Sequence, residues 1–535
     1  MKDIMRTKYF AILAILLVQM LVSCANVGYP TGGEVDKTPP KSTAFVPENE
    51  TRNFTSNSIS IYFDEYIQLK NVDNQVLISP PFEQKPEIVA KGKYVNIKIK
   101  DTLRSNTTYL FQFKNAIADN NEGNILPSLD YVFSTGATID SFSFKGIVVD
   151  ALTQKPDEDI YVFLYNDFSD SVVAISHPIY LTKTDKNGVF EFKYIAQGKY
   201  KIIALKDDDK SMTYNNITKK MAFKPEAIES YYVQDSCDTV NVRLNTFVQV
   251  SETQRITSNN LVKNGKAVVT TFIPLTNPKI TSPDNDLIVS SNKNRDTLQI
   301  WARQPVDSLM LFIKDETGID DTLNLRYFSK KGKKQKETFF KSNIKSTFPY
   351  FDTIKITFTN PIDTICDTAN FVYIKTQTDS FYTYLLFDSI KLNATVLLRL
   401  EADSNYQIII PKDRLTDIYG NKNDTILLKT KINTPGDYGT IKINLLSADS
   451  AEQYIVQVLS ERDDVIVEKI NIDNTIIFQN IKAGKYRIRV IHDTNKNGKW
   501  DSGDYWKNQQ PESVYYLDKV LELRNNWEIE EDISF

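Results

Sequence analysis

The chain has 535 residues, 41% of them hydrophobic and 25% charged, and its 64 basic and 68 acidic side chains give a formal net charge of −4. This composition is typical of a folded globular protein, and the length predicts about three or four domains, or more if they are small β modules. The balanced charge gives no sign of nucleic-acid binding. Only two histidines occur, His177 and His492, which nearly excludes catalytic triads and multi-histidine zinc sites.

The N-terminus predicts export and a lipid anchor. Basic residues precede an apolar run from Phe10 to Val22, a pattern typical of a secretory signal peptide and too short for a transmembrane helix. The run ends in Leu-Val-Ser-Cys, which resembles a bacterial lipobox and implies that residues 1–23 are removed and Cys24 is lipidated. An ordinary signal peptide with a chance cysteine is the alternative. Residues 24–42, rich in Gly and Pro, are predicted to form a tether.

Polar and apolar residues alternate along most of the chain, whereas no long segment has a helical period. The alternation is clearest at 59–63, 95–99, 354–358 and 486–490. A period of two with β-branched and aromatic residues indicates half-buried strands. The sequence therefore predicts an all-β protein made of several small sandwiches in series.

Residues 43–138 are the first predicted sandwich. They contain Asn106-Thr107-Thr108-Tyr109 and end with Phe133-Ser134-Thr135. These motifs resemble the bacterial Ig-like domain of the S-layer type. Together with the tether, they are similar to Bacteroidetes lipoproteins that carry this domain, which implies an outer-membrane location.

Residues 142–232 have a different pattern. Asp185-Lys186-Asn187-Gly188 forms a turn before a short strand, and Gly198-Lys199-Tyr200 begins the next strand. This arrangement resembles the carboxypeptidase-regulatory-like, transthyretin-like sandwich, a module that is non-catalytic.

An internal repeat organises the rest of the chain. Gly484-Lys485-Tyr486 repeats Gly198-Lys199-Tyr200 at an offset of 286 residues, and Pro511-Glu512 falls on Pro225-Glu226 at the same offset. The repeat predicts a second Ig-like domain over 340–434 and a second transthyretin-like sandwich over 436–535, with a connecting β domain over 240–335. The alternative is that β strands resemble one another by composition alone.

One segment, Asp493 to Asp504, matches a twelve-residue calcium loop. Calcium takes six to eight oxygen ligands, which alternate residues of a tight loop supply. The predicted ligands of a structural Ca²⁺ are Asp493, Asn495, Asn497, the Lys499 carbonyl, Asp501 and Asp504. An Asn-Gly hairpin turn without an ion is the alternative. In the first copy Met212 replaces the glycine, so we expect no ion there.

These features favour a non-enzymatic lipoprotein, anchored on the outer face of the outer membrane, that binds or scaffolds a protein partner. The resemblance implies a larger complex, such as barrel-assembly or nutrient-uptake machinery. A glycan-binding role is an alternative, because Trp500, Tyr505 and Trp506 could stack on sugars. A hydrolase that uses the acids at 64–65 or 157–159 is another. Sandwiches in series also predict an extended rod. Cleavage of the chain near residues 140, 240, 337 and 436 should then yield soluble pieces.

Overall fold

The computed structural model describes residues 36–230, 242–250, 253–328, 338–366, 372–446, 451–471 and 473–534. The predicted signal peptide, Cys24 and Cys237 lie outside the described residues. The prediction of an all-β protein is confirmed, because in these described ranges the strands are accompanied only by short helical turns. Within the described ranges, no helix is long and apolar enough to cross a bilayer.

The described chain consists of five modules, numbered in chain order. Module 1 extends from β1 to β10 and packs its sheets around a core that includes Ile61, Phe111 and Phe133, all fully buried. Its larger sheets have the orders β1-β2-β6-β5 and β10-β7-β4, and a small third sheet has the order β3-β8-β9. Its elements are β1 (Ser42–Val46), β2 (Ser58–Phe63), β3 (Ile67–Leu69), α2 (Val72–Gln75), β4 (Val76–Ser79), β5 (Glu87–Lys91), β6 (Tyr94–Lys98), β7 (Thr108–Phe113), β8 (Ile117–Asp119), β9 (Ile125–Leu126) and β10 (Asp130–Ser134).

Module 2 consists of strands joined in the order β13-β12-β15-β16-β18-β11-β14, with β17 paired to β15. Its first and last strands, β11 and β18, pair in parallel, which ties the two ends of the module together. Its elements are β11 (Phe142–Asp150), β12 (Tyr161–Tyr165), α3 (Val172–Ile175), β13 (Tyr180–Lys183), β14 (Val189–Ile195), β15 (Gly198–Leu205), β16 (Lys220–Phe223), β17 (Ile228–Ser230) and β18 (Val242–Val248).

Module 3 is a smaller sandwich of sheets β19-β20-β23-β22 and β21-β24-β25, with Trp301 fully buried. Its elements are β19 (Ile256–Val262), η1 (Lys263–Gly265), β20 (Lys266–Thr271), β21 (Lys279–Thr281), β22 (Leu287–Ser291), β23 (Thr297–Ala302), β24 (Ser308–Lys314) and β25 (Asp320–Arg326).

Module 4 resembles module 1 in its sheets, β26-β28-β33-β32 and β27-β36-β34-β30-β31, with a small pair β29-β35. In both modules a buried tyrosine hydroxyl accepts a hydrogen bond from a nearby backbone N–H, Tyr109 from Arg104 and Tyr406 from Glu401. The elements are β26 (Phe340–Ser342), β27 (Thr347–Phe348), β28 (Lys355–Phe358), β29 (Ile362–Ile365), β30 (Val372–Lys375), β31 (Ser380–Thr383), β32 (Leu385–Phe387), β33 (Asn393–Val396), β34 (Asn405–Ile410), β35 (Leu415–Asp417) and β36 (Ile426–Ile432).

Module 5 repeats the pairing pattern of module 2, because its first and last strands, β37 and β44, again pair in parallel. Its sheets are β40-β37-β44 and β39-β38-β41-β42, with β43 paired to β41. Its elements are η2 (Pro435–Asp437), β37 (Tyr438–Leu445), β38 (Gln453–Leu459), β39 (Val465–Ile470), β40 (Thr475–Lys482), β41 (Gly484–Asp493), β42 (Val514–Tyr516), β43 (Leu521–Leu523) and β44 (Glu528–Ile533).

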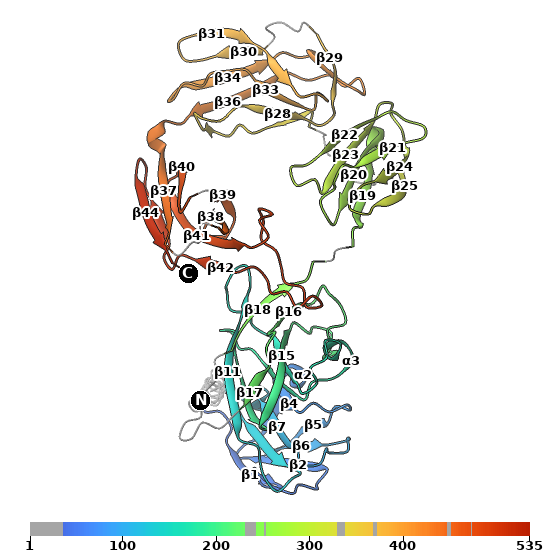
Figure 1. Ribbon diagram of the computed structural model, residues 1–535, viewed down its shortest axis with the longest axis vertical. Helices are drawn as coiled ribbons and strands as arrows, with labels where there is room; N and C mark the ends of the chain where they lie inside the picture. The colour runs from blue at the N-terminus through green and yellow to red at the C-terminus, as the bar shows by residue number, and fades with distance from the viewer. Residues whose placement is uncertain are drawn as a thin grey trace, which may run out of the picture.

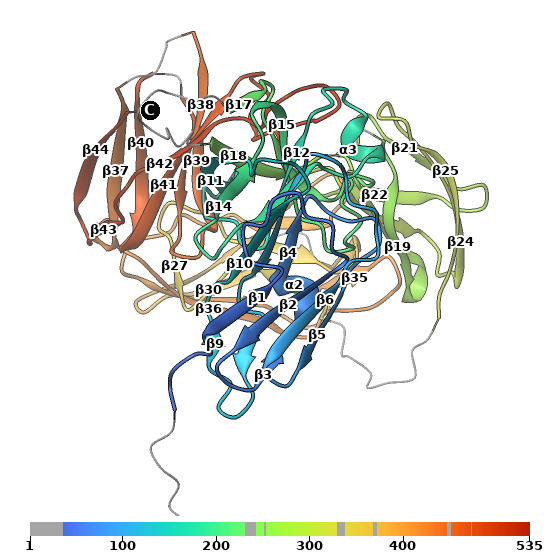
Figure 2. The same cartoon turned by 90° about the horizontal axis from the view of Figure 1, so that it is seen from below.

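The five modules follow one another along the chain, but they do not extend as a rod. They form a closed circuit in which module 5 returns to module 2 (Figure 1). When the molecule is seen from below, modules 3 and 5 lie on opposite sides of module 2 (Figure 2). The prediction of an extended rod is therefore wrong, because contacts between distant modules fold the chain back on itself.

Hydrogen bonds mark two other junctions of the circuit. Modules 3 and 4 are joined by Trp301 Nε1, which donates to Asn360 Oδ1 at 3.2 Å, and by the Tyr419 hydroxyl, which donates to the Ala302 carbonyl at 3.0 Å. Modules 4 and 5 are joined by the Tyr350 hydroxyl, which donates to Asn480 Oδ1 at 3.1 Å.

Strand register shows that the two copies of the repeat differ in length. Gly198 and Gly484 stand 286 residues apart, whereas their strand partners, Ser230 and Leu523, stand 293 apart. Module 5 therefore holds seven more residues than module 2 between these two strands.

Because module 5 has the longer connection, the expected equivalence of Pro511-Glu512 with Pro225-Glu226 is wrong. At the offset of 293 residues, Pro511-Glu512 does not correspond to Pro225-Glu226, and Glu512 corresponds instead to Lys219. The shared Pro-Glu dipeptide is a coincidence of sequence, because the strand pairings after the loop fix the register.

Candidate functional site

The segment predicted to bind calcium begins at the end of β41, where Asp493 is completely buried. Its Oδ2 accepts hydrogen bonds from the Gly498 backbone at 2.8 Å and from Gln453 Nε2 at 2.6 Å, and its Oδ1 accepts one from the Asn497 backbone at 3.1 Å. Gly498 has φ of +80°, a left-handed conformation that glycine adopts without strain. These contacts wrap the loop tightly around the Asp493 carboxylate.

The next predicted ligands converge on one carboxylate oxygen. The amide groups of Asn495 and Asn497 lie 2.6 and 2.5 Å from Asp501 Oδ2. The Lys499 backbone donates to Asn497 Oδ1 at 3.0 Å, which places Lys499 on the same loop. The structure therefore brings Asp493, Asn495, Asn497, Lys499 and Asp501 into one compact loop.

Asp504 is not part of this cluster. Its Oδ1 accepts hydrogen bonds from the backbones of Trp506 at 2.9 Å and Lys507 at 3.3 Å, so its carboxylate organises the following turn. Among the described residues, no three His, Cys, Asp or Glu side chains converge as a preformed metal site would require.

Glu512 is a loop contact that sequence reasoning missed. Its side chain is 6% exposed, and its Oε1 accepts hydrogen bonds from the Thr494 backbone at 2.8 Å and the Thr494 hydroxyl at 3.0 Å. Its Oε2 accepts one from the Asp501 backbone at 3.1 Å. No local motif reveals this residue, because it enters the loop from eight positions beyond Asp504.

The equivalent loop of module 2, which begins at Asp207, surrounds the side-chain ammonium group of Lys219. The Lys219 ammonium donates to Asp207 Oδ1 at 2.8 Å, Asp209 Oδ1 at 2.6 Å, the Ser211 hydroxyl at 2.8 Å and the Thr213 carbonyl at 3.1 Å. The hydrogen bond from Lys219 holds the pKa of Asp209 well below its usual range.

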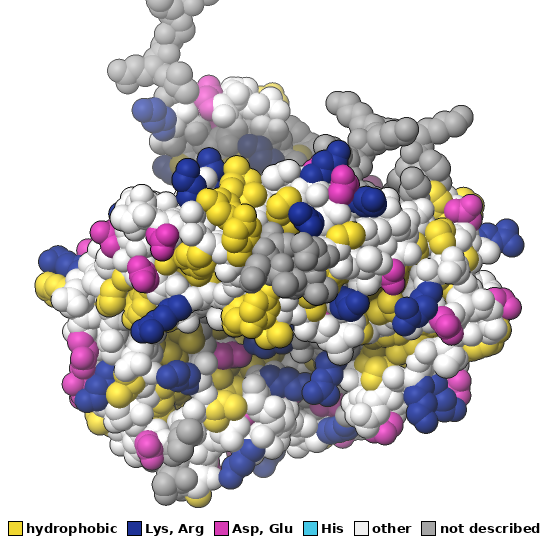
Figure 3. Space-filling model, turned by 90° about the horizontal axis from the view of Figure 1, so that it is seen from above, with side chains coloured by type: hydrophobic (Ala, Val, Ile, Leu, Met, Phe, Trp, Pro, Cys, Tyr) yellow, Lys and Arg dark blue, Asp and Glu magenta, His cyan; other side chains and the backbone are white. Residues whose placement is uncertain are grey.

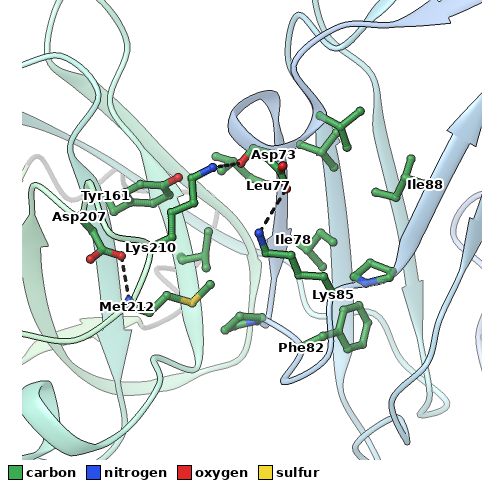
Figure 4. Close-up of a pocket in the computed structure, with 15 residues that line it drawn as sticks. Asp73, Leu77, Ile78, Phe82, Lys85, Ile88, Tyr161, Asp207, Lys210 and Met212 are labelled. Atoms are coloured by element: carbon green, nitrogen blue, oxygen red, sulfur yellow. Dashed lines mark hydrogen bonds and ion pairs between the residues drawn. The ribbon is translucent and has the colours of Figure 1, made fainter.

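This loop also lies against module 1. Asp207, Lys210 and Met212 line one side of a pocket of about 130 Å³ whose other side is formed by Leu77 and Phe82 of module 1 (Figure 4). Lys210 Nζ donates to the Asp73 carbonyl at 3.4 Å across the same junction. The lining is mostly apolar, so the pocket is part of the contact between the modules.

The segment that follows the module 5 loop docks on module 2. Tyr505 is 3% exposed and packs against Phe223, with ring centroids 5.2 Å apart, and its hydroxyl donates to the Asp170 carbonyl at 3.0 Å. A Cβ atom added at Gly503 would lie 2.6 Å from the Phe247 ring, so the two backbones approach closely. Tyr505 belongs to the same buried cluster as the core residues of module 2.

The aromatic residues considered for glycan stacking serve this docking contact. Tyr505 is buried, and Trp500 donates its Nε1 hydrogen to the Glu512 carbonyl at 3.1 Å. Trp506 stacks on Tyr214 of module 2, with ring centroids 6.2 Å apart. Tyr505 and Trp500 therefore pack within and between modules, whereas Trp506 contacts module 2 and is also 45% exposed.

A second contact between modules 2 and 5 is ionic. Asp463 of module 5 accepts from the Lys155 ammonium of module 2 at 2.5 Å and also pairs with Arg487 of its own module. The hydrogen bond from Lys155 and the charge of Arg487 lower the pKa of the Asp463 carboxyl.

This pair predicts that docking weakens in acid. A carboxyl whose pKa is lowered in the docked state stabilises that state above its ordinary pKa of 3.8, and the contribution is lost as the pH falls through the lowered value. Small-angle X-ray scattering should therefore show expansion of the molecule below about pH 4. Asp463→Asn should expand it at neutral pH, whereas the exposed neighbour change Glu461→Gln should not. Equal responses of the two variants would contradict this assignment.

Three of the acids considered for a hydrolase form ion pairs or hydrogen bonds within the protein. Asp157 pairs with Lys220 at 2.6 Å, and Asp159 pairs with Lys183 at 2.9 Å. Asp64 accepts a hydrogen bond from the Lys41 backbone at 2.9 Å.

Comparisons with known proteins support the assignment of module 1. Residues 36–135 match the sequence model of the bacterial Ig-like domain, and residues 432–506 match that of a family described as an uncharacterized protein conserved in bacteria, DUF2141. The second match includes the loop that begins at Asp493. No curated protein matches the chain.

Solved structures that match the chain include a pilin subunit and a surface layer protein. The Bacillus anthracis TIE protein has a TM-score of 0.15 and 10% identity, with 94% of this chain and 76% of that chain covered. The major pilin subunit of Bacillus cereus, BcpA, has a TM-score of 0.15 and 10% identity, covering 74% of this chain and 99% of that one. Surface layer protein SbsC, domains 1–6, has a TM-score of 0.14 and 10% identity, covering 91% and 67%. Residues 36–135 match the bacterial Ig-like domain in sequence, and their structure consists mainly of strands.

Proposed function

We propose that the chain is a non-enzymatic lipoprotein, anchored through Cys24 to the outer face of the outer membrane, that binds a protein partner within a larger complex. The lipobox-like sequence before Cys24 supports the anchor, because two or more acyl chains hold a protein stably on a membrane. The Ig-like match of module 1 supports a binding or scaffolding role. Barrel-assembly or nutrient-uptake machinery is the setting that we favour.

The observation that carries this proposal is an exposed apolar stripe on module 4. Tyr382 and Leu386 are 61% and 60% exposed, and Tyr384 and Leu397 are exposed beside them. Module 4 lies at the end of the molecule opposite module 1, which follows the tether (Figure 1). Viewed from that end, the surface presents hydrophobic side chains among charged ones (Figure 3).

The backbone beneath the stripe favours a protein partner. β31 is the edge strand of one sheet and β32 is the edge strand of the other, so residues 380–387 border both sheets of the module. An edge strand offers unpaired N–H and C=O groups to an added strand, and exposed aromatic residues supply contact area. Main-chain pairing and aromatic contacts together suit the recognition of an extended segment of another protein.

The experiment is affinity purification of the tagged protein from gently solubilised membranes. Wild type should recover a stoichiometric protein partner, and Tyr382→Ser with Tyr384→Ser should lose it without a change in melting temperature, because both side chains are already exposed. Ile175→Ser, which changes an exposed apolar residue of module 2, should retain the partner. Cys24→Ala should leave the membrane fraction. Membrane retention of Cys24→Ala would contradict the anchor, and unchanged recovery by the double variant would contradict the binding stripe.

A further inference from the structure

The two copies of the loop differ at one structurally equivalent position that controls their charge. Leu205 pairs with Met221 in module 2, and the equivalent Ile491 pairs with Val514 in module 5. Lys219 and Glu512 each stand two residues before the paired residue that follows the loop. A lysine in one copy therefore corresponds to a glutamate in the other.

In module 2 the Lys219 ammonium contacts the oxygen atoms that a calcium loop uses. Counted from Asp207, the side chains of Asp209 and Ser211 and the carbonyl of Thr213 are at positions 3, 5 and 7. Lys219 lies outside this run of residues and reaches into it. The loop thus surrounds a cation that happens to belong to the protein.

In module 5 the same positions are kept, but the internal cation is gone. Asp493, Asn495, Asn497 and the Lys499 carbonyl are the equivalents of the four groups that contact Lys219. Glu512 replaces the lysine and adds a second buried carboxylate, which accepts a hydrogen bond from the backbone of Thr494, the residue after Asp493. Amide and hydroxyl groups donate to these acids, and no lysine or arginine of the described chain forms an ion pair with Asp493, Asp501 or Glu512.

We propose that the module 5 loop binds one Ca²⁺ ion at the place that the Lys219 ammonium occupies in module 2. Asp493, Asn495, Asn497, the Lys499 carbonyl, Asp501 and Glu512 supply the oxygens, and Asp504 is not a ligand. Two buried carboxylates without a charged partner are costly, and a divalent cation offsets that cost. A set made wholly of carboxylate, amide and carbonyl oxygens suits a hard cation that accepts six to eight ligands.

Binding requires the side chains of the loop to rotate, and the backbone hydrogen bonds that Asn495 Oδ1 and Asn497 Oδ1 now accept are exchanged for contacts with the ion. The amides of Asn495 and Asn497 already point at Asp501 Oδ2, and turning them by half a rotation presents their oxygens to the same place. The Glu512 carboxylate is held at the loop by the backbones of Thr494 and Asp501, and in this proposal it turns with the Asp501 carboxylate toward Asp493 when the ion binds. Rotations of this kind are common when a protein binds its partner.

The test is calorimetric titration of the metal-free full-length protein, in detergent, with Ca²⁺ alone. Wild type should bind one ion. Asp501→Asn and Glu512→Gln should each weaken binding about tenfold or more, as loss of a ligand or its support does. Asp504→Asn, a matched change in the next turn, should bind as wild type does. Absence of binding at millimolar Ca²⁺, or weakening by Asp504→Asn equal to that by Asp501→Asn, would overturn the proposal.

Glu512→Lys separates the proposed site from a simple folding role. The introduced ammonium should take the place of the ion, as Lys219 does, so this variant should not bind Ca²⁺ and should melt above wild type in the presence of a chelator. A variant that melts below chelated wild type, or that still binds Ca²⁺ with wild-type affinity, would overturn the equivalence of the two loops.

Discussion

Replacing Tyr505 with alanine should release module 5 from module 2 and expand the whole molecule. The side chain is 3% exposed, packs on Phe223 and Tyr214, and donates its hydroxyl hydrogen to the Asp170 carbonyl. Removing a buried aromatic side chain costs about 3–5 kcal/mol, and here the loss lowers the stability of the docked arrangement relative to the open one. Small-angle X-ray scattering should show an increased radius of gyration, while circular dichroism keeps the wild-type strand signal.

Trp527→Ala is the matched control. Trp527 is an exposed aromatic residue of module 5 that contacts Arg524 of its own module. Its loss should leave the scattering profile unchanged. A Tyr505→Ala profile that superposes on that of wild type would show that this residue does not hold the circuit closed.

Replacing Lys219 with methionine should destabilise module 2 and make it respond to calcium. The Asp207 side chain is 1% exposed, and removing the partner of a buried carboxylate costs about 3 kcal/mol. Because the oxygens that contact Lys219 then surround an uncompensated charge, Ca²⁺ should restore part of the lost stability. Urea unfolding of the full-length protein, with and without millimolar Ca²⁺, measures both effects.

Lys210→Met serves as the control for this change. Lys210 is an exposed residue of the same loop, and its Nζ contacts only the Asp73 carbonyl among the hydrogen bonds of the described chain. Its unfolding midpoint should match that of wild type. If Lys219→Met is as stable as Lys210→Met in the absence of Ca²⁺, the ammonium does not stabilise the loop.

The strands were predictable because alternation is a local property. The segments at 59–63 and 95–99 alternate between core and solvent, and they lie almost wholly within β2 and β6. The segment at 486–490 lies within β41, where Arg489 is buried as well as the apolar residues. Each such strand needs only its own residues to reveal a buried face. The positions of Asp493, Asn495 and Asn497 were predictable for the same reason, because a tight loop is also specified locally.

Features that depend on distant residues could not be predicted. The contact of Tyr505 with Phe223 and Asp170 joins segments about three hundred residues apart, and no periodicity encodes it. Glu512 was missed because an offset of 286 residues pairs it with Glu226, and only the strand pairings reveal the longer connection. Insertions of this kind are invisible to a constant-offset comparison when chance places similar residues in register.

The seven additional residues have a consequence for the strength of the contact that they build. They lie in the connection that carries Gly503 and Tyr505 onto module 2. The surface of module 5 that docks and the surface of module 2 that receives it belong to one chain, so they are joined covalently through modules 3 and 4. Such tethering gives each surface an effective concentration on the order of 1 mM around the other. An intrinsic dissociation constant of about 10 µM would then keep about 99% of the molecules closed. With such a constant, a contact too weak to dimerise separate proteins is sufficient, and a partner competing for the same surface would need to overcome about 3 kcal/mol to open the circuit.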